Sequence, residues 1–284
     1  MATSNTKGVL MYACNTANIN YLTIACLNVS LIRSNMGDLP ITIVTDQNSI
    51  DSVCDISKGV LSSVDIVLTS SAGSTKEMQY VDNDDSTWLE TSPYDETIVI
   101  DPDYLILNDT LNTLWGINSD MVVIDETMHV DSSTPTTAYV NHKRDLKLIW
   151  GAAVYFKKTA FTKHFFNTMR IVTANYEYAR RSFQIEGTCY RRDHMLSIAH
   201  HIVTGGVTHM PETGEIISSP FPLVVSSAIN EVLDIQDTSK LLLKLADKDA
   251  GIYPMLCNCN VLPMNKIDLS RKASFLISRI LKHV

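Results

Sequence analysis

The sequence predicts an α/β protein with a mostly parallel sheet. Short apolar runs at residues 8–14, 40–45 and 64–69 suit buried strands, a helical repeat separates the first two, and polar residues follow each strand. Ligands of such sheets bind at the carboxyl ends of the strands, so the polar residues there are the first site candidates. A chain of 284 residues can bury one substantial core, and we expect a single domain over residues 1–284.

The first half of the chain, about residues 1–125, alternates strands with helical and polar segments. The helical repeat covers residues 21–36 and stops before Gly37, a residue type that commonly follows a helix end. Residues 70–92 contain no long apolar run and are predicted to form a loop with room for one helix. A strand at 97–100 ends directly in an Asp-Pro-Asp sequence. The remaining elements of this half are a helical turn at 108–115 and a strand at 121–124.

The second half, about residues 126–284, is predicted to contain a loop, one strand and three helices. Residues 131–143 are rich in Ser, Thr and Pro, which suits a mobile loop that could serve as a lid. The other predicted elements are a strand at 149–156, helices at 162–181, 193–203 and 270–283, and a loop or hairpin at 205–222.

Composition indicates a protein of the cytoplasm without a membrane span. No leader sequence opens the chain, and no apolar run approaches the roughly 18 to 20 residues of a spanning helix. The six cysteines are scattered, which argues against a disulfide framework. Cys257 and Cys259 form a lone Cys-x-Cys without a second pair at zinc-ligand spacing.

The charge is distributed unevenly along the chain. The net charge is -8, yet residues 142–192 hold 11 Lys and Arg against three acidic residues, a net charge of +8 for that segment. One basic segment in an acidic protein is typical of contact with an anionic partner, although solvated helix faces give the same pattern.

Asp101 and Asp103 are the strongest candidates for a metal site. They follow a β-branched apolar strand and precede Tyr-Leu-Ile-Leu, so they lie at the edge of the core, where charge is costly unless a cation compensates it. Two carboxylates in this position can hold a divalent cation that bridges a diphosphate; an acidic turn without a ligand is the alternative. Two further Asp-x-Asp pairs lie in polar surroundings that suit a solvated surface. These are Asp82 with Asp84 and Asp247 with Asp249.

The sequence around this pair resembles nucleotide-sugar glycosyltransferases of the GT-A fold. The run PYDETIVIDPDYLILND is similar to the strand and Asp-x-Asp region of that family. The segments GVLMYACNTANINYLTIACLNVSLIRSN, LPITIVTD, IWGAAVYFKK and CYRRDHMLSIAHHI resemble further elements, so the similarity spans scattered motifs over residues 8–205. It implies a Rossmann-like mixed, mostly parallel sheet flanked by helices. It also implies a nucleotide-sugar-binding half up to residue 125 and an acceptor-side half after it.

Transferred residue by residue, the resemblance implies a donor site at the strand ends. Asp101 and Asp103 would bind Mn²⁺ or Mg²⁺ and the diphosphate of a nucleotide sugar, with a UDP-sugar as the expected donor. Contacts to the nucleotide would come from Tyr12, Asn15 and Asp46, at the ends of the first two strands.

The resemblance also implies roles for residues later in the chain. Asp193 would lie beside the transferred sugar, as an orienting group or a base, with a helix N-cap as the structural alternative. The segment NVLPMNKIDL resembles a metal-binding region of the family but lacks its His, which leaves an Asn as third ligand and Lys266 as a phosphate contact. The candidates for this ligand are Asn265, Asn258 and Asn260. An Arg common upstream of the Asp-x-Asp strand is also missing, and Lys76 is the nearest cation.

The acceptor is open between two classes. The chain is also similar to bacteriophage glycosyltransferases that modify DNA, which implies 5-hydroxymethylcytosine or another 5-hydroxymethylated base as acceptor and DNA binding through residues 142–192. The alternative acceptor is a glycan, a lipid precursor or a protein. A third hypothesis, favoured by the missing His, is a nucleotide-sugar-binding module without catalysis.

Overall fold

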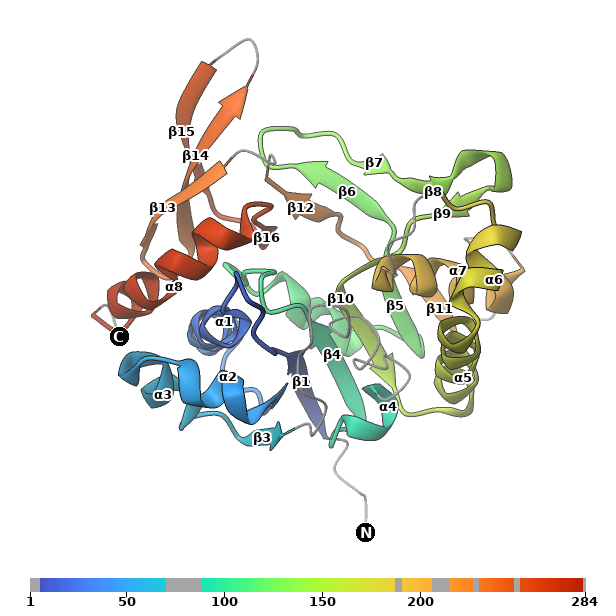
Figure 1. Ribbon diagram of the computed structural model, residues 1–284, viewed down its shortest axis with the longest axis horizontal. Helices are drawn as coiled ribbons and strands as arrows, with labels where there is room; N and C mark the ends of the chain where they lie inside the picture. The colour runs from blue at the N-terminus through green and yellow to red at the C-terminus, as the bar shows by residue number, and fades with distance from the viewer. Residues whose placement is uncertain are drawn as a thin grey trace.

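The structure is a computed structural model that describes residues 6–69, 88–186, 191–205, 215–226, 230–247 and 251–282. Within these residues a seven-stranded sheet forms the centre of the molecule (Figure 1). Its strands are β1 (Lys7–Tyr12), β2 (Ile41–Thr45), β3 (Ile66–Thr69), β4 (Glu96–Ile100), β5 (Met121–Ile124), β10 (Trp150–Lys157) and β11 (Ile216–Ser218).

The order across the central sheet is β11-β5-β10-β4-β1-β2-β3. β10 runs antiparallel to both of its neighbours, and the other six strands share one direction. The predicted fold class, a mixed and mostly parallel sheet flanked by helices, is therefore confirmed. β2 and β4 are buried along their whole length, as their apolar runs predict. Because the carboxyl ends of the parallel strands meet at one edge, polar residues that follow different strands converge there.

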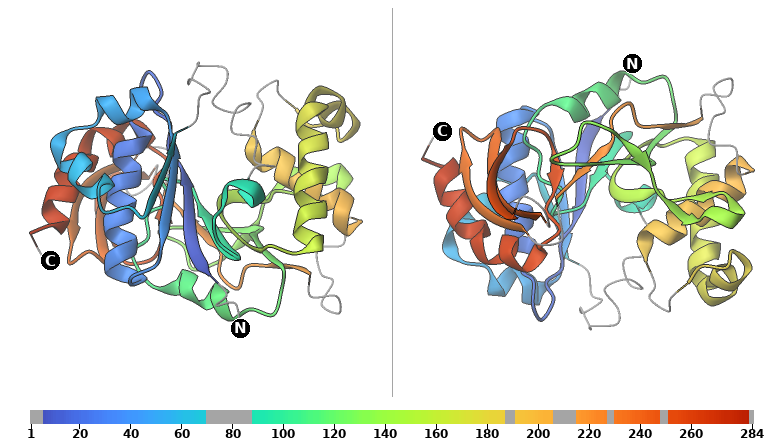
Figure 2. Two further views of the ribbon diagram at one scale, coloured as in Figure 1. Left: turned by 90° about the horizontal axis from the view of Figure 1, so that it is seen from below. Right: turned by 90° about the horizontal axis from the view of Figure 1, so that it is seen from above.

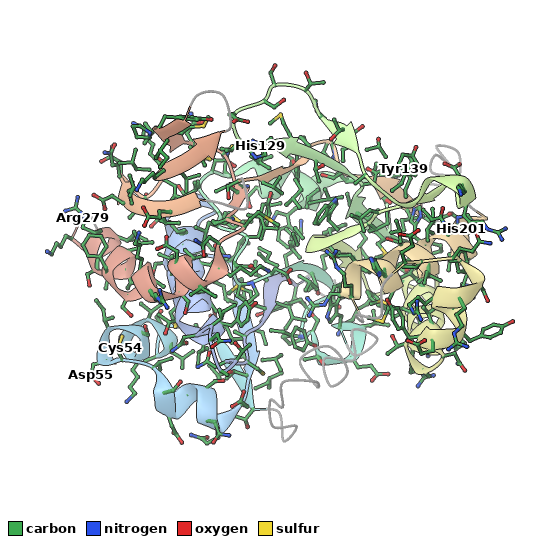
Figure 3. The ribbon with its side chains drawn as sticks, turned by 45° about the horizontal axis from the view of Figure 1, so that its top comes forward. Cys54, Asp55, His129, Tyr139, His201 and Arg279 are labelled. Atoms are coloured by element: carbon green, nitrogen blue, oxygen red, sulfur yellow. The ribbon has the colours of Figure 1, made fainter. Side chains whose placement is uncertain are left out.

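Helices cover both faces of this sheet (Figure 2). They are α1 (Tyr21–Asn35), α2 (Gln47–Ser52), α3 (Asp55–Leu61), α4 (Trp88–Thr91), α5 (Ala160–Ala174), α6 (Tyr176–Ser182), α7 (Arg192–Thr204) and α8 (Lys266–Ile280). α1 packs against α3 and α8 on one face, and α5 packs against α7 on the other. Successive residues of β1 show this division, because Met11 belongs to the core under α1 and Leu10 to the core under α5 and α7. Figure 3 shows Cys54, before α3, and His201, on α7, at opposite sides of the molecule.

The described residues also form three smaller sheets. Their strands are β6 (Glu126–His129), β7 (Thr136–Thr137), β8 (Tyr139–Asn141), β9 (Leu146–Lys147), β12 (Leu223–Val225), β13 (Asn230–Gln236), β14 (Lys240–Asp247), β15 (Gly251–Cys257) and β16 (Val261–Leu262), with 3-10 helices η2 (Thr110–Gly116) and η3 (His142–Arg144). Figure 1 shows β14 and β15 projecting from the molecule beyond α8. Leu105 connects the central sheet to β16, because it exchanges two backbone hydrogen bonds with Val261, of 2.9 and 3.0 Å.

Two predictions for the second half are corrected by backbone hydrogen bonds. The helix expected at 162–181 is two helices, because Asn175 leaves the helical conformation (φ -121°, ψ 30°) and its Nδ2 donates to the carbonyl of Ile171 at 2.9 Å. The loop expected at 131–143 contains β7 and β8, which are held by pairing with β6 and β9.

The C-terminal part differs most from its prediction. The antiparallel strands β13, β14 and β15 have no counterpart among the predicted elements. The segment predicted as loop or hairpin at 205–222 includes β11, which pairs in parallel with β5, while residues 206–214 lie outside the described residues. The last helix begins at Lys266, four residues earlier than predicted, because Asn265 caps it by accepting a hydrogen bond from the Asp268 N–H. Within the described residues, no helix combines the length and apolar character that crossing a bilayer requires.

Candidate active site

Asp101 and Asp103 lie in a tight turn at the carboxyl end of β4. The Asp101 N–H donates to the carbonyl of Ala152 on β10 at 2.9 Å, and the Tyr104 N–H donates back to the Asp101 carbonyl at 3.0 Å. From the other side, the Asn28 amide of α1 donates to the Tyr104 carbonyl at 2.8 Å. The turn is thus fixed by hydrogen bonds to elements on each side of it, which gives the two carboxylates defined positions.

The Asp101 carboxylate is neutralised by a cation from the helix that covers one face of the sheet. Arg192, the first residue of α7, donates from its NH1 to Asp101 Oδ1 at 2.8 Å. The guanidinium also lies over the buried Trp88 indole, with 5.6 Å from its carbon to the ring centroid. Burial raises the pKa of Asp101 to about 6, and the nearby Asp103 and Asp193 add to the effect, while Arg192 and Lys266 oppose it.

The Asp103 carboxylate is neutralised by a cation from the opposite face. Its side chain is 2% exposed, and its Oδ2 lies 2.6 Å from the Lys266 Nζ at the start of α8. No hydrogen bond of normal geometry reaches this oxygen from the residues that the structure describes. Burial by itself would lower the pKa of Lys266, but the charge of Asp103, with Tyr21 and Asp101, raises it, so the ammonium stays charged.

Asp193 connects the first turn of α7 to β10. Its Oδ1 accepts a hydrogen bond from the Gly151 N–H at 2.9 Å, and its Oδ2 lies 3.0 Å from Arg191. The N-cap position of α7 belongs to Arg191, so the structural alternative for Asp193, a helix N-cap, does not apply. Gly151 suits this close approach, because a Cβ there would lie 3.1 Å from the Arg192 Cδ and 3.3 Å from the Leu196 Cδ1, closer than usual contacts.

A separate pocket of about 460 Å³ lies at the same sheet edge, between the segments that follow β1 and β2. Asn15 and Asp46, two of the predicted nucleotide contacts, line it. Asp46 accepts hydrogen bonds from the Ser49 N–H and hydroxyl at 2.9 and 2.8 Å, and Asn15 accepts one from the Leu22 N–H at 2.9 Å. Both side chains therefore shape the walls of this pocket. Tyr12, the third predicted contact, is partly buried at the end of β1.

Two of the three candidates for the third metal ligand use their carbonyl oxygens in hydrogen bonds. Asn265 Oδ1 accepts a hydrogen bond from the Asp268 N–H at 3.2 Å. Asn260 is buried, and its Oδ1 accepts hydrogen bonds from the N–H groups of Leu107 and Asn108 at 2.8 and 3.0 Å. Within the described ranges, no three His, Cys, Asp or Glu side chains gather into a group that could hold a metal ion.

Other predicted residues fall outside the site or outside the described part. Lys76 and the Asp82 and Asp84 pair lie in residues 70–87, outside the described residues. Of the remaining pair, Asp249 likewise lies outside the described residues.

Sequence reasoning missed the ion pair between Arg192 and Asp101 and a buried polar cluster at the end of β5. Arg192 was counted only in the basic segment, although an Arg directly before Asp193 at a helix start is a signal that it could approach the same site. The cluster centres on Asp125, at the end of β5, whose Oδ2 accepts from the Ser218 hydroxyl at 2.8 Å and lies 3.5 Å from the Lys147 Nζ. Burial lowers the pKa of the adjacent His200 to about 4.

Comparison with known proteins gives similarity at the level of overall structure. No protein-family model matches the chain, and no curated protein does either. The galactosyltransferase LgtC, solved with donor and acceptor sugar analogs, is similar over 75% of this chain and 73% of its own, at 10% identity and a TM-score of 0.45. Mouse xyloside xylosyltransferase 1 is similar over 75% of this chain and 85% of its own, at 11% identity and a TM-score of 0.44.

A third similar structure is the glycosyltransferase GlyE of Streptococcus pneumoniae TIGR4. It matches 76% of this chain, which spans 46% of GlyE, at 11% identity and a TM-score of 0.43. These values describe a loosely similar arrangement of elements, so the residues of the site itself must carry any functional conclusion.

Proposed function

We propose that this protein is a metal-dependent glycosyltransferase that transfers a sugar from a nucleotide-diphosphate sugar to an acceptor hydroxyl. The observation that carries the proposal is the Asp-Pro-Asp turn, in which a cation from a different helix neutralises each carboxylate. A fixed pair of carboxylates beside two cations matches the needs of a metal diphosphate, in which charge grows on the leaving group.

Asp101 and Asp103 fit Mn²⁺ or Mg²⁺ as the metal. Both are oxygen donors in one turn, and the buried Oδ2 of Asp103 already faces a cation, the Lys266 ammonium at 2.6 Å. Asn265 fits less well, because its carbonyl oxygen caps α8. When bound, such an ion would act as a Lewis acid on the diphosphate.

The other residues of the site would bind and orient the donor. Lys266, on the Asp103 side, would contact a phosphate oxygen, and Asp193 would orient the transferred sugar or accept the proton of the acceptor hydroxyl. The pocket formed with Asn15 and Asp46 would receive the nucleoside, with Tyr12 beside it and UDP-sugars as the first donors to test. In this proposal residues 1–125 form most of the donor site, to which Asp193 and Lys266 contribute, and the rest of residues 126–284 form the acceptor side.

For the acceptor, DNA with a 5-hydroxymethylated base is the first candidate, and the exposed Lys143 and Arg144 of η3 favour it. A glycan, lipid precursor or protein is the second candidate. Internal ion pairs favour this second class, because Lys147, Arg180 and Arg192 of the basic segment are held by carboxylates and contribute less charge to a polyanion.

The direct test is transfer. The protein is incubated with Mn²⁺, a panel of sugar nucleotides, and either hydroxymethylated or plain DNA, and digested nucleosides are weighed by mass spectrometry. Added hexose or pentose mass on the hydroxymethylated nucleoside supports the full proposal. Turnover of a sugar nucleotide without a DNA-linked product rejects DNA as the acceptor and leaves the proposed transferase activity standing. Binding of a sugar nucleotide without turnover, unchanged in Asp101→Ala, supports a non-catalytic binding module instead.

A further inference from the structure

We infer that Arg192 is a phosphate-binding cation, held on Asp101 while the site is empty and transferred to the donor diphosphate when a metal ion takes Asp101. This inference rests on the proposed function and adds a residue to its binding machinery. Lys266 would serve the other side of the diphosphate.

Contacts to Asp101 and Trp88 hold the head of Arg192 at the site. Its NH1 donates to Asp101 Oδ1 at 2.8 Å, and the guanidinium carbon lies 5.6 Å from the centroid of the Trp88 ring. Trp88 is fully buried, so it is a fixed surface on which the guanidinium can pivot. The side chain of Arg192 retains 20% exposure, which leaves the head within reach of a ligand.

The charges of the site make an exchange favourable. Asp101 and Asp103 with Arg192 and Lys266 sum to zero in the free site. A divalent cation and UDP, whose diphosphate carries about three negative charges, add roughly one negative charge; the diphosphate of a UDP-sugar carries about two, which the cation balances. Metal and guanidinium repel each other at a shared carboxylate, whereas the guanidinium fork fits phosphate oxygens and gains charge-assisted hydrogen bonds there.

The exchange predicts opposite effects on two ligands. Without the charge of Arg192, the free site carries a net negative charge, so Mn²⁺ alone should bind more tightly. With metal bound, removal of Arg192 takes away a cation that would contact the diphosphate, so UDP should bind less tightly. A purely structural role for Arg192 would weaken both together, because both depend on the same folded turn.

The experiment measures Mn²⁺ binding by electron paramagnetic resonance and UDP binding at saturating Mn²⁺ by calorimetry. In Arg192→Gln we expect Mn²⁺ affinity to rise about threefold to tenfold and UDP affinity to fall at least about tenfold, consistent with loss of a charged hydrogen-bond donor. Arg181→Gln is the matched control, because Arg181 is 78% exposed on α6 and its Nε lies 3.9 Å from Glu177. It should leave both affinities unchanged.

Arg192→Lys keeps the charge but not the planar fork, and it keeps the test valid where Arg192→Gln unfolds. We expect its Mn²⁺ affinity to match the wild type and its UDP affinity to fall, by less than in Arg192→Gln. Changes of the same sign for both ligands, or no change in UDP affinity, would overturn the role of Arg192. Absence of Mn²⁺-dependent UDP binding in the wild type would instead reject the proposed function.

Discussion

Two groups of polar side chains share one edge of the sheet but are satisfied in different ways. In the pocket beside β1 and β2, Asp46 and Asn15 bond to neutral groups a few residues away in the chain, Ser49 and Leu22. In the turn after β4, Asp101 and Asp103 pair with charged groups from α7 and α8, on opposite faces of the sheet.

This difference indicates that the pocket residues mainly determine local structure, whereas the residues of the turn can bind ligands. Local neutral hydrogen bonds fix the loops and form the pocket wall, and their loss costs stability. Ion pairs between distant elements, partly open to solvent, can exchange partners when a metal or an anion enters. Substitutions in the pocket should therefore affect folding as well as nucleoside binding, whereas substitutions in the turn should affect metal binding.

The largest effect is expected from Asp103→Asn. Removing one of two ligand carboxylates should lower Mn²⁺-dependent UDP affinity by about 1,000-fold, roughly 4 kcal/mol, while the protein stays folded. Calorimetry with UDP and circular dichroism measure the two quantities. Asp109→Asn is the control, because Asp109 is exposed six residues later and its side chain makes no cap hydrogen bond. Unchanged UDP affinity in Asp103→Asn would make the turn structural.

The second prediction concerns the pH dependence of stability, which we expect to depend on α7, the helix that carries Arg192 and Asp193. His200 of α7 is buried and stays neutral, because desolvation lowers its pKa from 6.5 to about 4. The unfolded chain therefore takes up the proton first, and stability is lost as the pH falls from about 6.5 to about 4, by up to about 3 kcal/mol. Urea unfolding at each pH should show a smaller acid loss in His200→Gln than in the wild type. The control is His201→Gln, whose position on α7 Figure 3 shows, and its pH profile should follow the wild type. Equal pH profiles for all three proteins would contradict the assignment of the acid loss to His200.

In the pocket, Asp46→Ala should act on folding. It removes two hydrogen bonds from Ser49, one of which caps α2, so the free energy of unfolding should fall by about 1–2 kcal/mol. Urea denaturation measures this loss. Mn²⁺ affinity should not change, and Asp55→Ala at the exposed start of α3 should alter neither quantity. A large loss of Mn²⁺ affinity in Asp46→Ala would remove the contrast between the two groups.

The smallest effect is expected from Gly151→Ala. The added Cβ would press on the Arg192 Cδ at 3.1 Å and the Leu196 Cδ1 at 3.3 Å, and the flexible Arg192 side chain can absorb part of the shift. UDP affinity should fall about threefold, within 1 kcal/mol. Gly116→Ala is the control, because no atom lies within 4 Å of a Cβ there. Equal UDP affinity in the two variants would show that the contact between β10 and α7 does not position the site.

Local patterns were sufficient to predict the first half of the fold. β1, α1, β2, β3 and β4 appear within about two residues of their expected positions, because each is a continuous apolar or helical run. The strands β13 and β14 escaped prediction because their turn lacks Gly and Asn. Asp237 and Thr238 occupy it with φ of 51° and 56°, a conformation uncommon for such residues and stabilised only within the folded hairpin.

The candidate site was predictable only in part, because local sequence patterns do not show which distant residues will pair. A strand followed by Asp-Pro-Asp places both carboxylates at a sheet edge, and this much is local. The partners Arg192 and Lys266 lie far along the chain, and their pairing depends on how α7 and α8 cover the two faces. Asn265 as a metal ligand stays a prediction; that its carbonyl oxygen also caps α8 could not be predicted, because it depends on where α8 begins.

The central claim is that Asp101 and Asp103 bind a metal together with a nucleotide diphosphate, and thermodynamic linkage tests it most directly. UDP binding is measured by calorimetry with Mn²⁺ and with EDTA, and Mn²⁺ binding with and without UDP. We predict that each ligand raises the affinity for the other by the same factor, about 100-fold or more, and that Asp101→Asn abolishes the coupling. Equal UDP affinity with Mn²⁺ and with EDTA in the wild type would contradict the claim.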